Sequence, residues 1–305
     1  MTPESPGTGA PETPHAPGWR GHWRAWRQRL RIALATLRHP GIVRAQRRHF
    51  TREPWRTLCA RHPELHRKLF QPYPIAGLSV PERWRWMQAH ERWMRQLFTD
   101  AAQRQILLDG GTVACRVALP DGHGAPTIQL RYAHHYLQEG ELSLVLHDPF
   151  GTPLYALTFL FVDEPDGRQG VLVGALQGQL STELDAHLTH LALGVRPPTL
   201  LLFTLQCLAE GLGAVRLRAA GRTRHAYAGR RLARRIRFDY DAFWQASGGS
   251  LAEDGLWTLP LHPPRRAAGD IPARKRAHYR RRYAWLDTLR ADIAARLVPS
   301  RRDSC

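Results

Sequence analysis

The chain lacks the cysteine pairs and long apolar runs that mark disulfide-rich and membrane-spanning proteins. Its four cysteines lie far apart and form no C-x-x-C pair, so we expect reduced thiols in a cytoplasmic protein. No uninterrupted apolar stretch approaches the roughly 20 residues that cross a bilayer. Residues 1–18 have neither the basic start nor the apolar run of a signal peptide, and their composition predicts a disordered tail.

The common catalytic motifs and metal-ligand spacings are also missing. No G-x-S-x-G, P-loop, G-x-G-x-x-G or H-E-x-x-H pattern occurs, which leaves the usual hydrolase, kinase and dehydrogenase interpretations without support. His134 and His135 are neighbours in a predicted strand, so we expect their side chains on opposite faces. His187 and His190 are three residues apart, but no cysteine or carboxylate completes a ligand set. We therefore predict no metal site.

Acidic residues are scarce at both ends of the chain, and the positive charge is concentrated there. Residues 19–52 contain ten Arg and no acid, and residues 265–302 contain twelve Lys or Arg against three Asp. Residues 53–264 are nearly neutral, with 22 basic and 20 acidic side chains. This division predicts that the ends meet an anionic membrane surface or an acidic partner.

Residues 19–52 form a basic, tryptophan-rich arm for which the spacing predicts a helix from Trp19 to about Leu37. Tryptophans on one face and arginines on the others are typical of a helix that lies in the plane of a membrane. A helix that packs on the domain and exposes a basic face is the alternative. The predicted membrane-binding residues are Trp19, Arg20, Trp23, Arg24, Trp26 and Arg27.

The middle of the chain predicts an antiparallel meander. Ile128, Leu130 and Tyr132 alternate with polar residues, which indicates a strand with one face in water. LTFLFV and VLVGAL do not alternate, so we expect central strands that are covered on both faces. Connections as short as Glu164–Gly167 join antiparallel strands, because a parallel pair needs a crossover.

Helices surround the meander in the sequence. Ser79 and Glu82 have the spacing of a capping box before a Trp-rich helix, and prolines 197 and 198 suit the first turn of an apolar helix. Val215 to Ala219 then alternate as a strand, and residues 225–237 and 273–297 have helical patterns. We predict an α+β fold, with flanking helices on a mostly antiparallel sheet, in a single domain of residues 53–300.

Nine segments carry a resemblance to a known family: LFQPYPIAGLS, QEGELSL, LYALTF, VGALQG, GVRPP, RHAY, FDYDAFW, WTLP and KRAHYRRRYAWL. Their order and spacing are similar to those of the VirK/YbjX family of Gram-negative bacteria. The resemblance covers nearly everything after about residue 35. It implies a cytoplasmic protein associated with virulence and with tolerance of cationic antimicrobial peptides, but it supplies no reaction and no catalytic residues.

The order of elements also resembles the acyl-CoA N-acyltransferase fold. By this resemblance Gly194 and Arg196 would bind the pyrophosphate of coenzyme A at a helix start, and Tyr227 would protonate the leaving thiolate. Gln177 and Gly178, which end a buried strand, would line the same cleft. The alternatives are that Gly194 only caps a helix, that Arg196 pairs with a carboxylate and that Gln177 satisfies a turn.

Two further motifs remain open between a structural and a functional role. In FDYDAFW, Asp239 and Asp241 could act as a base or bind Arg, but an aromatic plug is favoured, with the two acids paired to Arg234, Arg235 or Arg237. The last helix contains a basic group that could contact phosphates or form a solvated face (Lys275, Arg276, Arg280, Arg281 and Arg282). No nucleic-acid motif accompanies it. We predict a protein that acts at the inner face of the envelope; the alternative is an acyl-CoA-dependent enzyme.

Overall fold

The structure is a computed structural model. It describes residues 26, 30, 32–119, 125–178, 182–229, 236, 238–297 and 300–302. The predicted tail of residues 1–18 and five of the six predicted membrane-binding residues, Trp26 being the exception, lie outside this range.

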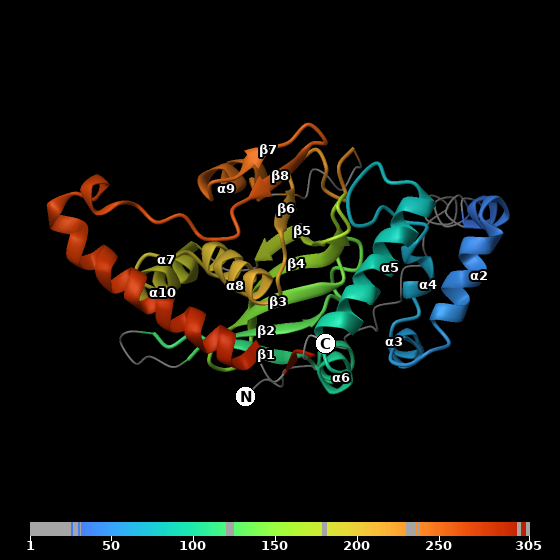
Figure 1. The fold of residues 1–305 in the computed structure, drawn as a ribbon, viewed down its shortest axis with the longest axis horizontal. Helices are drawn as coiled ribbons and strands as arrows, with labels where there is room; N and C mark the ends of the chain where they lie inside the picture. Colours follow the sequence, from blue (N-terminus) through green and yellow to red (C-terminus); the bar gives the residue numbers. More distant parts are fainter. Residues whose placement is uncertain are drawn as a thin grey trace, which may run out of the picture.

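An eight-stranded sheet forms the centre of the described part of the molecule (Figure 1). Its order is β1-β2-β3-β4-β5-β6-β8-β7, and every neighbouring pair is antiparallel except β5 and β6. The strands are β1 (Thr112–Arg116), β2 (Thr127–Tyr132), β3 (Leu142–His147), β4 (Pro153–Asp163), β5 (Gln169–Gly178), β6 (Arg216–Ala220), β7 (Ser250–Leu251) and β8 (Leu256–Leu259). The predicted α+β class, the meander β2 to β5 and the mostly antiparallel sheet are confirmed.

The burial of the strands follows the predicted patterns. Buried and half-buried residues alternate along β2, whereas all six residues of β3 and most of β4 and β5 are buried. The central strands are therefore covered on both faces, as their unbroken apolar runs predict.

Helices cover the sheet and its ends. Helix α8 packs on β3 and β4, α10 packs on α8 and β1, and α5 packs on β4 (Figure 1). The helices are α2 (Pro40–His49), α3 (Trp55–Arg61), α4 (Leu65–Lys68), α5 (Val80–Leu97), α6 (Asp100–Leu107), α7 (Thr182–Leu191), α8 (Pro197–Gly211), α9 (Tyr240–Ala246) and α10 (Arg276–Leu297), and residues 26, 30 and 32–38 are also helical. None of the helices in the described ranges is long and apolar enough to cross a membrane.

Local signals fix where several helices begin and end. Ser79 Oγ accepts the Glu82 amide while the Glu82 carboxylate accepts the Ser79 amide, so the predicted capping box is confirmed. Two prolines occupy the first turn of α8, whose apolar surface is buried almost all round. The residues from His225 to Gly229 form turns. The start of the helix predicted for residues 225–237 is therefore wrong, since His225 forms a bridge with Ile75, and residues 230–235 and 237 lie outside the described ranges.

One hydrophobic cluster joins both ends of the described chain. It includes Phe50 and Trp55 near the start, the β-sheet and α8 in the middle, and Ile293 and Leu297 of α10. A smaller cluster around Tyr73 and Leu160 fills another part of the interior. The chain end reinforces this closure, because the Thr99 amide donates to the Ser300 carbonyl at 3.0 Å and the Arg302 amide to Leu97.

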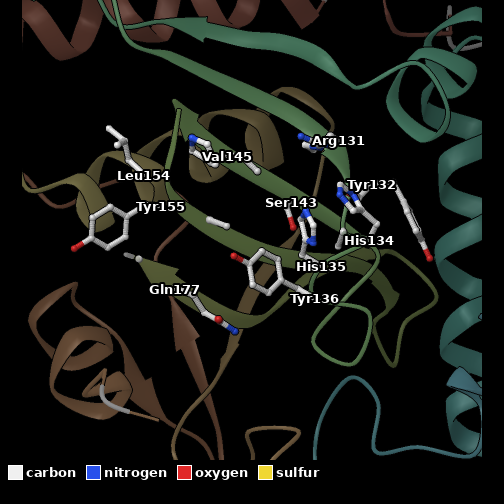
Figure 2. A pocket seen from close by; sticks show the side chains of 14 residues that line it. Arg131, Tyr132, His134, His135, Tyr136, Ser143, Val145, Leu154, Tyr155 and Gln177 are labelled. Carbon is white, nitrogen blue, oxygen red and sulfur yellow. The ribbon is translucent and has the colours of Figure 1, made fainter. Parts of the chain in front are cut away.

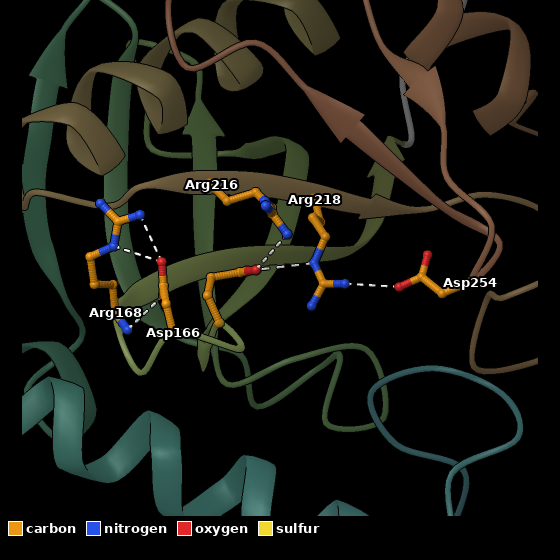
Figure 3. A network of polar contacts seen from close by, with 6 residues as sticks. Asp166, Arg168, Arg216, Arg218 and Asp254 are labelled. Atoms are coloured by element: carbon orange, nitrogen blue, oxygen red, sulfur yellow. Dashed lines mark hydrogen bonds and ion pairs between the residues drawn. The ribbon is translucent and has the colours of Figure 1, made fainter.

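A charged network anchors the first residues of the parallel strand pair (Figure 3). The Glu164 carboxylate, 4 % exposed, lies 3.0 Å from an Arg216 amino nitrogen and 3.6 Å from Arg218 Nε. Arg218 also donates to Asp254 at 2.9 Å. The β4–β5 turn, β6 and the turn before β8 are thereby tied together at the end of the sheet where β5 begins.

Candidate functional site

A pocket of about 400 Å³ opens over strands β2 to β5, at the end of the sheet where β5 stops (Figure 2). Its floor includes Val145 and Ala156, and the segment of residues 133–136 after β2 forms a wall. The sequence-predicted residues Gln177 and Gly178 both line it. Gly178 leaves room for a ring, because a Cβ there would lie 2.0 Å from the Tyr155 ring.

One side of the pocket is cationic. Arg131 of β2 lies there with His134 and His135, on the opposite side from Tyr155 and Gln177 (Figure 2). Burial, then the charges of His135 and Arg131, lowers the pKa of His134 to about 4. His134 is therefore neutral near pH 7, and the fixed positive charge of the pocket is the Arg131 guanidinium.

The prediction that His134 and His135 point to opposite faces is wrong. Strand β2 ends at Tyr132, and both histidines lie in the following turn with ring centroids 3.9 Å apart. The alternation of a strand no longer applies there. Within the described ranges, no three His, Cys, Asp or Glu side chains are grouped in a way that could hold a metal ion.

Hydrogen-bonding groups form the other side. The Tyr155 hydroxyl donates to the Asp185 carboxylate at 3.1 Å, and burial, together with that carboxylate, raises the pKa of Tyr155 to about 12. The Gln177 amide donates to both oxygens of Glu139, at 2.8 and 2.7 Å. Asp185 and Glu139 each bond one of these lining side chains, and none of the described residues that line the pocket is an Asp or Glu.

Glu139 is a buried carboxylate next to the pocket. It is 1 % exposed, and one oxygen lies 3.4 Å from His225 Nε2. His225 Nδ1 accepts the Tyr227 amide at 3.2 Å, so the ring proton of a neutral His225 belongs on Nε2, facing Glu139. Glu139 therefore holds Gln177 and His225 in fixed orientations at the end of β5.

A second buried carboxylate follows one residue after Gly140. Lys68 Nζ lies 2.8 Å from a Glu141 oxygen and donates to the Gly140 carbonyl at 2.9 Å. The Tyr73 hydroxyl donates to the other Glu141 oxygen at 2.5 Å. The segment between β2 and β3 is thus held from both sides by charged contacts inside the protein.

Strand β5 continues beyond its parallel partner. The β5–β6 register runs only from the Gly170–Arg216 pair to the Val173–Ala219 pair, although β5 extends to Gly178. The Tyr240 hydroxyl bonds the freed edge, donating to the Leu176 carbonyl at 2.9 Å and accepting the Leu176 amide at 3.2 Å. Strand β5 therefore continues beside the pocket after β6 has ended at Ala220.

The other predicted cofactor residues are not among those that line the pocket, although Arg196 is close enough to the lining residue Tyr155 for its charge to oppose the rise in the Tyr155 pKa. Gly194, with φ +78°, follows α7, and its amide donates to the Thr189 carbonyl at 2.7 Å. Arg196 is the exposed N-cap residue of α8, whose first two positions are prolines without N–H groups. Tyr227, the predicted proton donor, is half-buried in the turn after β6, with its ring 5.5 Å from His225. The roles of these residues remain predictions.

The FDYDAFW segment is an aromatic plug, as favoured. Trp244 is fully buried, and its Nε1 donates to the Ala220 carbonyl at 3.0 Å. Asp239 caps α9 by accepting the Ala242 amide, and Asp241 accepts Trp257 Nε1 at 2.8 Å. Both acids therefore have structural partners, while the predicted arginine partners, Arg234, Arg235 and Arg237, lie outside the described residues.

The arm presents an exposed apolar stripe on its helical residues 26, 30 and 32–38. Of the six large hydrophobic side chains that are exposed in the described residues, four belong to it. These are Trp26 (53 % exposed), Leu30 (43 %), Leu34 (56 %) and Leu37 (77 %), which we call the arm stripe. Helix α2 follows directly and carries exposed Arg44, Arg47 and Arg48, while its Val43 is buried.

The first half of α10 and the turn before it are strongly basic. The exposed basic residues are Arg274 and Lys275 of that turn and Arg276, Arg280 and Arg281 of α10, while Arg282 donates to the Leu193 carbonyl at 2.7 Å. Leu289, Ile293 and Leu297 of this helix are fully buried, whereas its Tyr279, Tyr283 and Leu286 are only partly covered.

Sequence reasoning missed Arg131, Tyr136 and Tyr155 as pocket residues and Glu139 as a buried carboxylate. The alternation of β2 predicts that Arg131 faces water. A side chain on the wall of an open pocket also contacts water, so the same pattern fits both positions. Glu139 lies in the segment Gln138–Gly140, whose residues are typical of a turn between strands. Nothing local in the sequence indicates its burial, because its partners Gln177 and His225 are distant in the chain.

Comparison with known proteins gives relatives without an assigned activity. Residues 21–295 match the family described as "Protein of unknown function (DUF535)". The chain is 26 % identical over 287 residues to the uncharacterized protein YbjX of Escherichia coli strain K12, covering 91 % of this chain and 85 % of that protein. Two uncharacterized proteins of Haemophilus influenzae are 34 % and 32 % identical, over 53 % and 63 % of this chain and 54 % and 61 % of their own lengths. The predicted YbjX-like family is confirmed.

Proposed function

The chain belongs to the DUF535 family, and on that premise we propose that it works at an anionic membrane surface, to which the arm attaches it. The observation that carries the proposal is the arm stripe. Apolar side chains of this size are usually buried, and an exposed apolar stripe next to cationic side chains is the pattern of a helix that lies in a lipid interface.

The free energy that the arm contributes is sufficient for reversible membrane binding. Burying a whole Leu side chain contributes about 1.5–3 kcal/mol, so the exposed halves of Leu34 and Leu37 would contribute about 1–2 kcal/mol each on entering the acyl boundary. Each Arg close to an anionic surface adds about 1 kcal/mol. Arg44, Arg47 and Arg48 are exposed on the neighbouring helix, and the basic half of α10 offers a further cationic surface.

The proposal includes a cytoplasmic protein that is peripheral to the inner membrane. The association with virulence and with tolerance of cationic peptides, which the VirK/YbjX resemblance implies, is part of the same proposal. A protein that occupies anionic lipid at the inner face would act where such peptides damage the envelope.

Vesicle co-sedimentation tests the membrane proposal. The full chain should sediment with vesicles that contain about one third phosphatidylglycerol and much less with phosphatidylcholine alone, and binding should weaken as salt screens the arginines. Leu34→Asp should reduce binding about tenfold or more, because it removes an apolar contact and adds a repelled charge.

Leu251→Asp is the matched control, since Leu251 of β7 is 61 % exposed and lies far from the arm in the sequence. It should bind vesicles like the unmodified chain. Equal losses for Leu34→Asp and Leu251→Asp, or equal binding to both kinds of vesicle, would contradict the proposal.

An acyl-CoA-dependent transfer is the second candidate, and one observation favours it. Strand β5 extends beyond its pairing with β6, and at that edge the backbone of Leu176 bonds the Tyr240 hydroxyl. An extended ligand such as the arm of an acyl-CoA could pair with the backbone groups of such a strand edge. Calorimetric titration with acetyl-CoA and longer acyl-CoA should give heat that Tyr240→Phe alters. Absence of heat at high protein concentration would remove this candidate.

A further inference from the structure

The pocket over β2 to β5 combines an apolar floor with a single fixed charge. Val145, Leu154 and Ala156 line it along the sheet, and Arg131 stands on one side. The groups opposite Arg131 are the Tyr155 hydroxyl and the Gln177 amide (Figure 2). A ligand that fits this arrangement has an apolar body and one anionic end.

Arg131 has no carboxylate partner among the residues that the structure describes. Across the described ranges, no carboxylate lies within ion-pairing distance of its guanidinium, in contrast to Arg216 and Arg218 at the other end of the sheet. The side chain is half-buried, so water solvates it only in part. A partly desolvated cation without a partner is a favourable position for an oxyanion, which a guanidinium can bind through two parallel hydrogen bonds.

The neighbours of Arg131 add hydrogen-bond donors. Arg131 is directly opposite Ser143 in the β2–β3 register. His134 and His135 lie on the same side of the pocket, and His147 of β3 is close enough for Arg131 to lower its pKa after the effect of burial. The neutral imidazole of His134 can donate to an anion through one ring nitrogen. Arg131 is the one Arg or Lys among the described residues that line the pocket, which matches a single acidic head.

We propose that this pocket binds an amphiphile with one acidic head, a carboxylate or a phosphate, with Arg131 bonding the head and the floor of β3 and β4 contacting the apolar body. The two heads share the same oxyanion chemistry. The proposal depends neither on membrane attachment nor on acyl transfer, because its test uses monomeric probes without a bilayer or coenzyme A.

The experiment is calorimetric titration of the full chain with octanoate, octyl phosphate and octanol, all below their aggregation concentrations. The chain should bind at least one of the two anions about tenfold more tightly than octanol, as expected for a hydrogen bond to a charged group. The stronger of the two anions identifies the head. In Arg131→Gln the preference over octanol should fall below about twofold, while Arg131→Lys should keep part of it.

Arg116→Gln is the matched control, because Arg116 is an exposed arginine of the same sheet that does not line the pocket. It should bind like the unmodified chain, and circular dichroism verifies that each variant is folded. If Arg131→Gln is unfolded, the Arg131→Lys titration and the comparison of the anions with octanol in the unmodified chain still test whether Arg131 binds the acidic head. Equal affinity for octanol and both anions, no binding of any probe, or equal losses in Arg131→Gln and Arg116→Gln would overturn the proposal.

Discussion

Removing one partner of the buried Lys68–Glu141 pair should destabilise the protein far more than removing both. Each residue is 2 % exposed, and the Lys68 ammonium lies 2.8 Å from the Glu141 carboxylate. In Lys68→Met the carboxylate stays buried with only the Tyr73 hydroxyl as its partner. An uncompensated buried charge costs about 3–5 kcal/mol of unfolding free energy.

The double-mutant cycle supplies the magnitude. Glu141→Leu alone should also cost about 3–5 kcal/mol, because it leaves the ammonium buried beside the Gly140 carbonyl. In Lys68→Met/Glu141→Leu no charge remains, and the cost should be about 1–3 kcal/mol for the unsatisfied Tyr73 hydroxyl. The coupling energy is then about 3 kcal/mol or more. Adding Tyr73→Phe should recover most of the remaining loss.

Urea unfolding followed by tryptophan fluorescence measures these free energies. Arg92→Met is the control, since Arg92 pairs with Asp163 at the surface with side chains 47 % and 42 % exposed; it should cost less than about 1 kcal/mol. The reasoning is refuted if Lys68→Met costs no more than Arg92→Met, or if the two single losses simply add in the double variant.

Two more predictions concern a buried histidine and a close backbone contact. Burial lowers the pKa of His90 from 6.5 to about 4. As the pH drops from 6.5 to 4, the unfolded chain binds the proton before the folded one, so the free energy of unfolding falls by at most about 3 kcal/mol. The urea midpoint should therefore depend less on pH in His90→Gln, and an unchanged dependence contradicts this. A Cβ on Gly174 would lie 1.7 Å from the Glu139 carbonyl oxygen, so Gly174→Ala should lower the melting temperature by the equivalent of about 3 kcal/mol. Gly41→Ala, in an open helical position, should be neutral or stabilising.

Most of the fold could be predicted from local sequence patterns. The unbroken apolar runs of β4 and β5, the capping box at Ser79 and the prolines of α8 all act through neighbours in the sequence, and each was predictable. Strand β1 was not predicted, because TVACR is short and only two of its five residues are fully buried. The burial of Glu139 depends on residues that the fold brings together from far along the chain.

The candidate site was predictable only where a strand end marked it. Gln177 and Gly178 line the pocket because the apolar run of β5 ends there. Arg131 was visible as the polar side of an alternating strand, but alternation cannot distinguish open solvent from a pocket wall. Gly194 and Arg196 rest on an analogy of element order, and the structure gives the Gly194 amide an internal partner.

The contacts of residues 300–302 with residues 97–99 affect how the chain folds during synthesis. Phe98 is 1 % exposed and forms a bridge with Arg301, whose neighbour Arg302 also donates to the Phe98 carbonyl across 204 positions. During synthesis, the seam between α5 and α6 therefore stays uncovered until residues 300–302 have been translated. Contacts this distant in the sequence slow folding, so a nascent chain should need other protection for that seam.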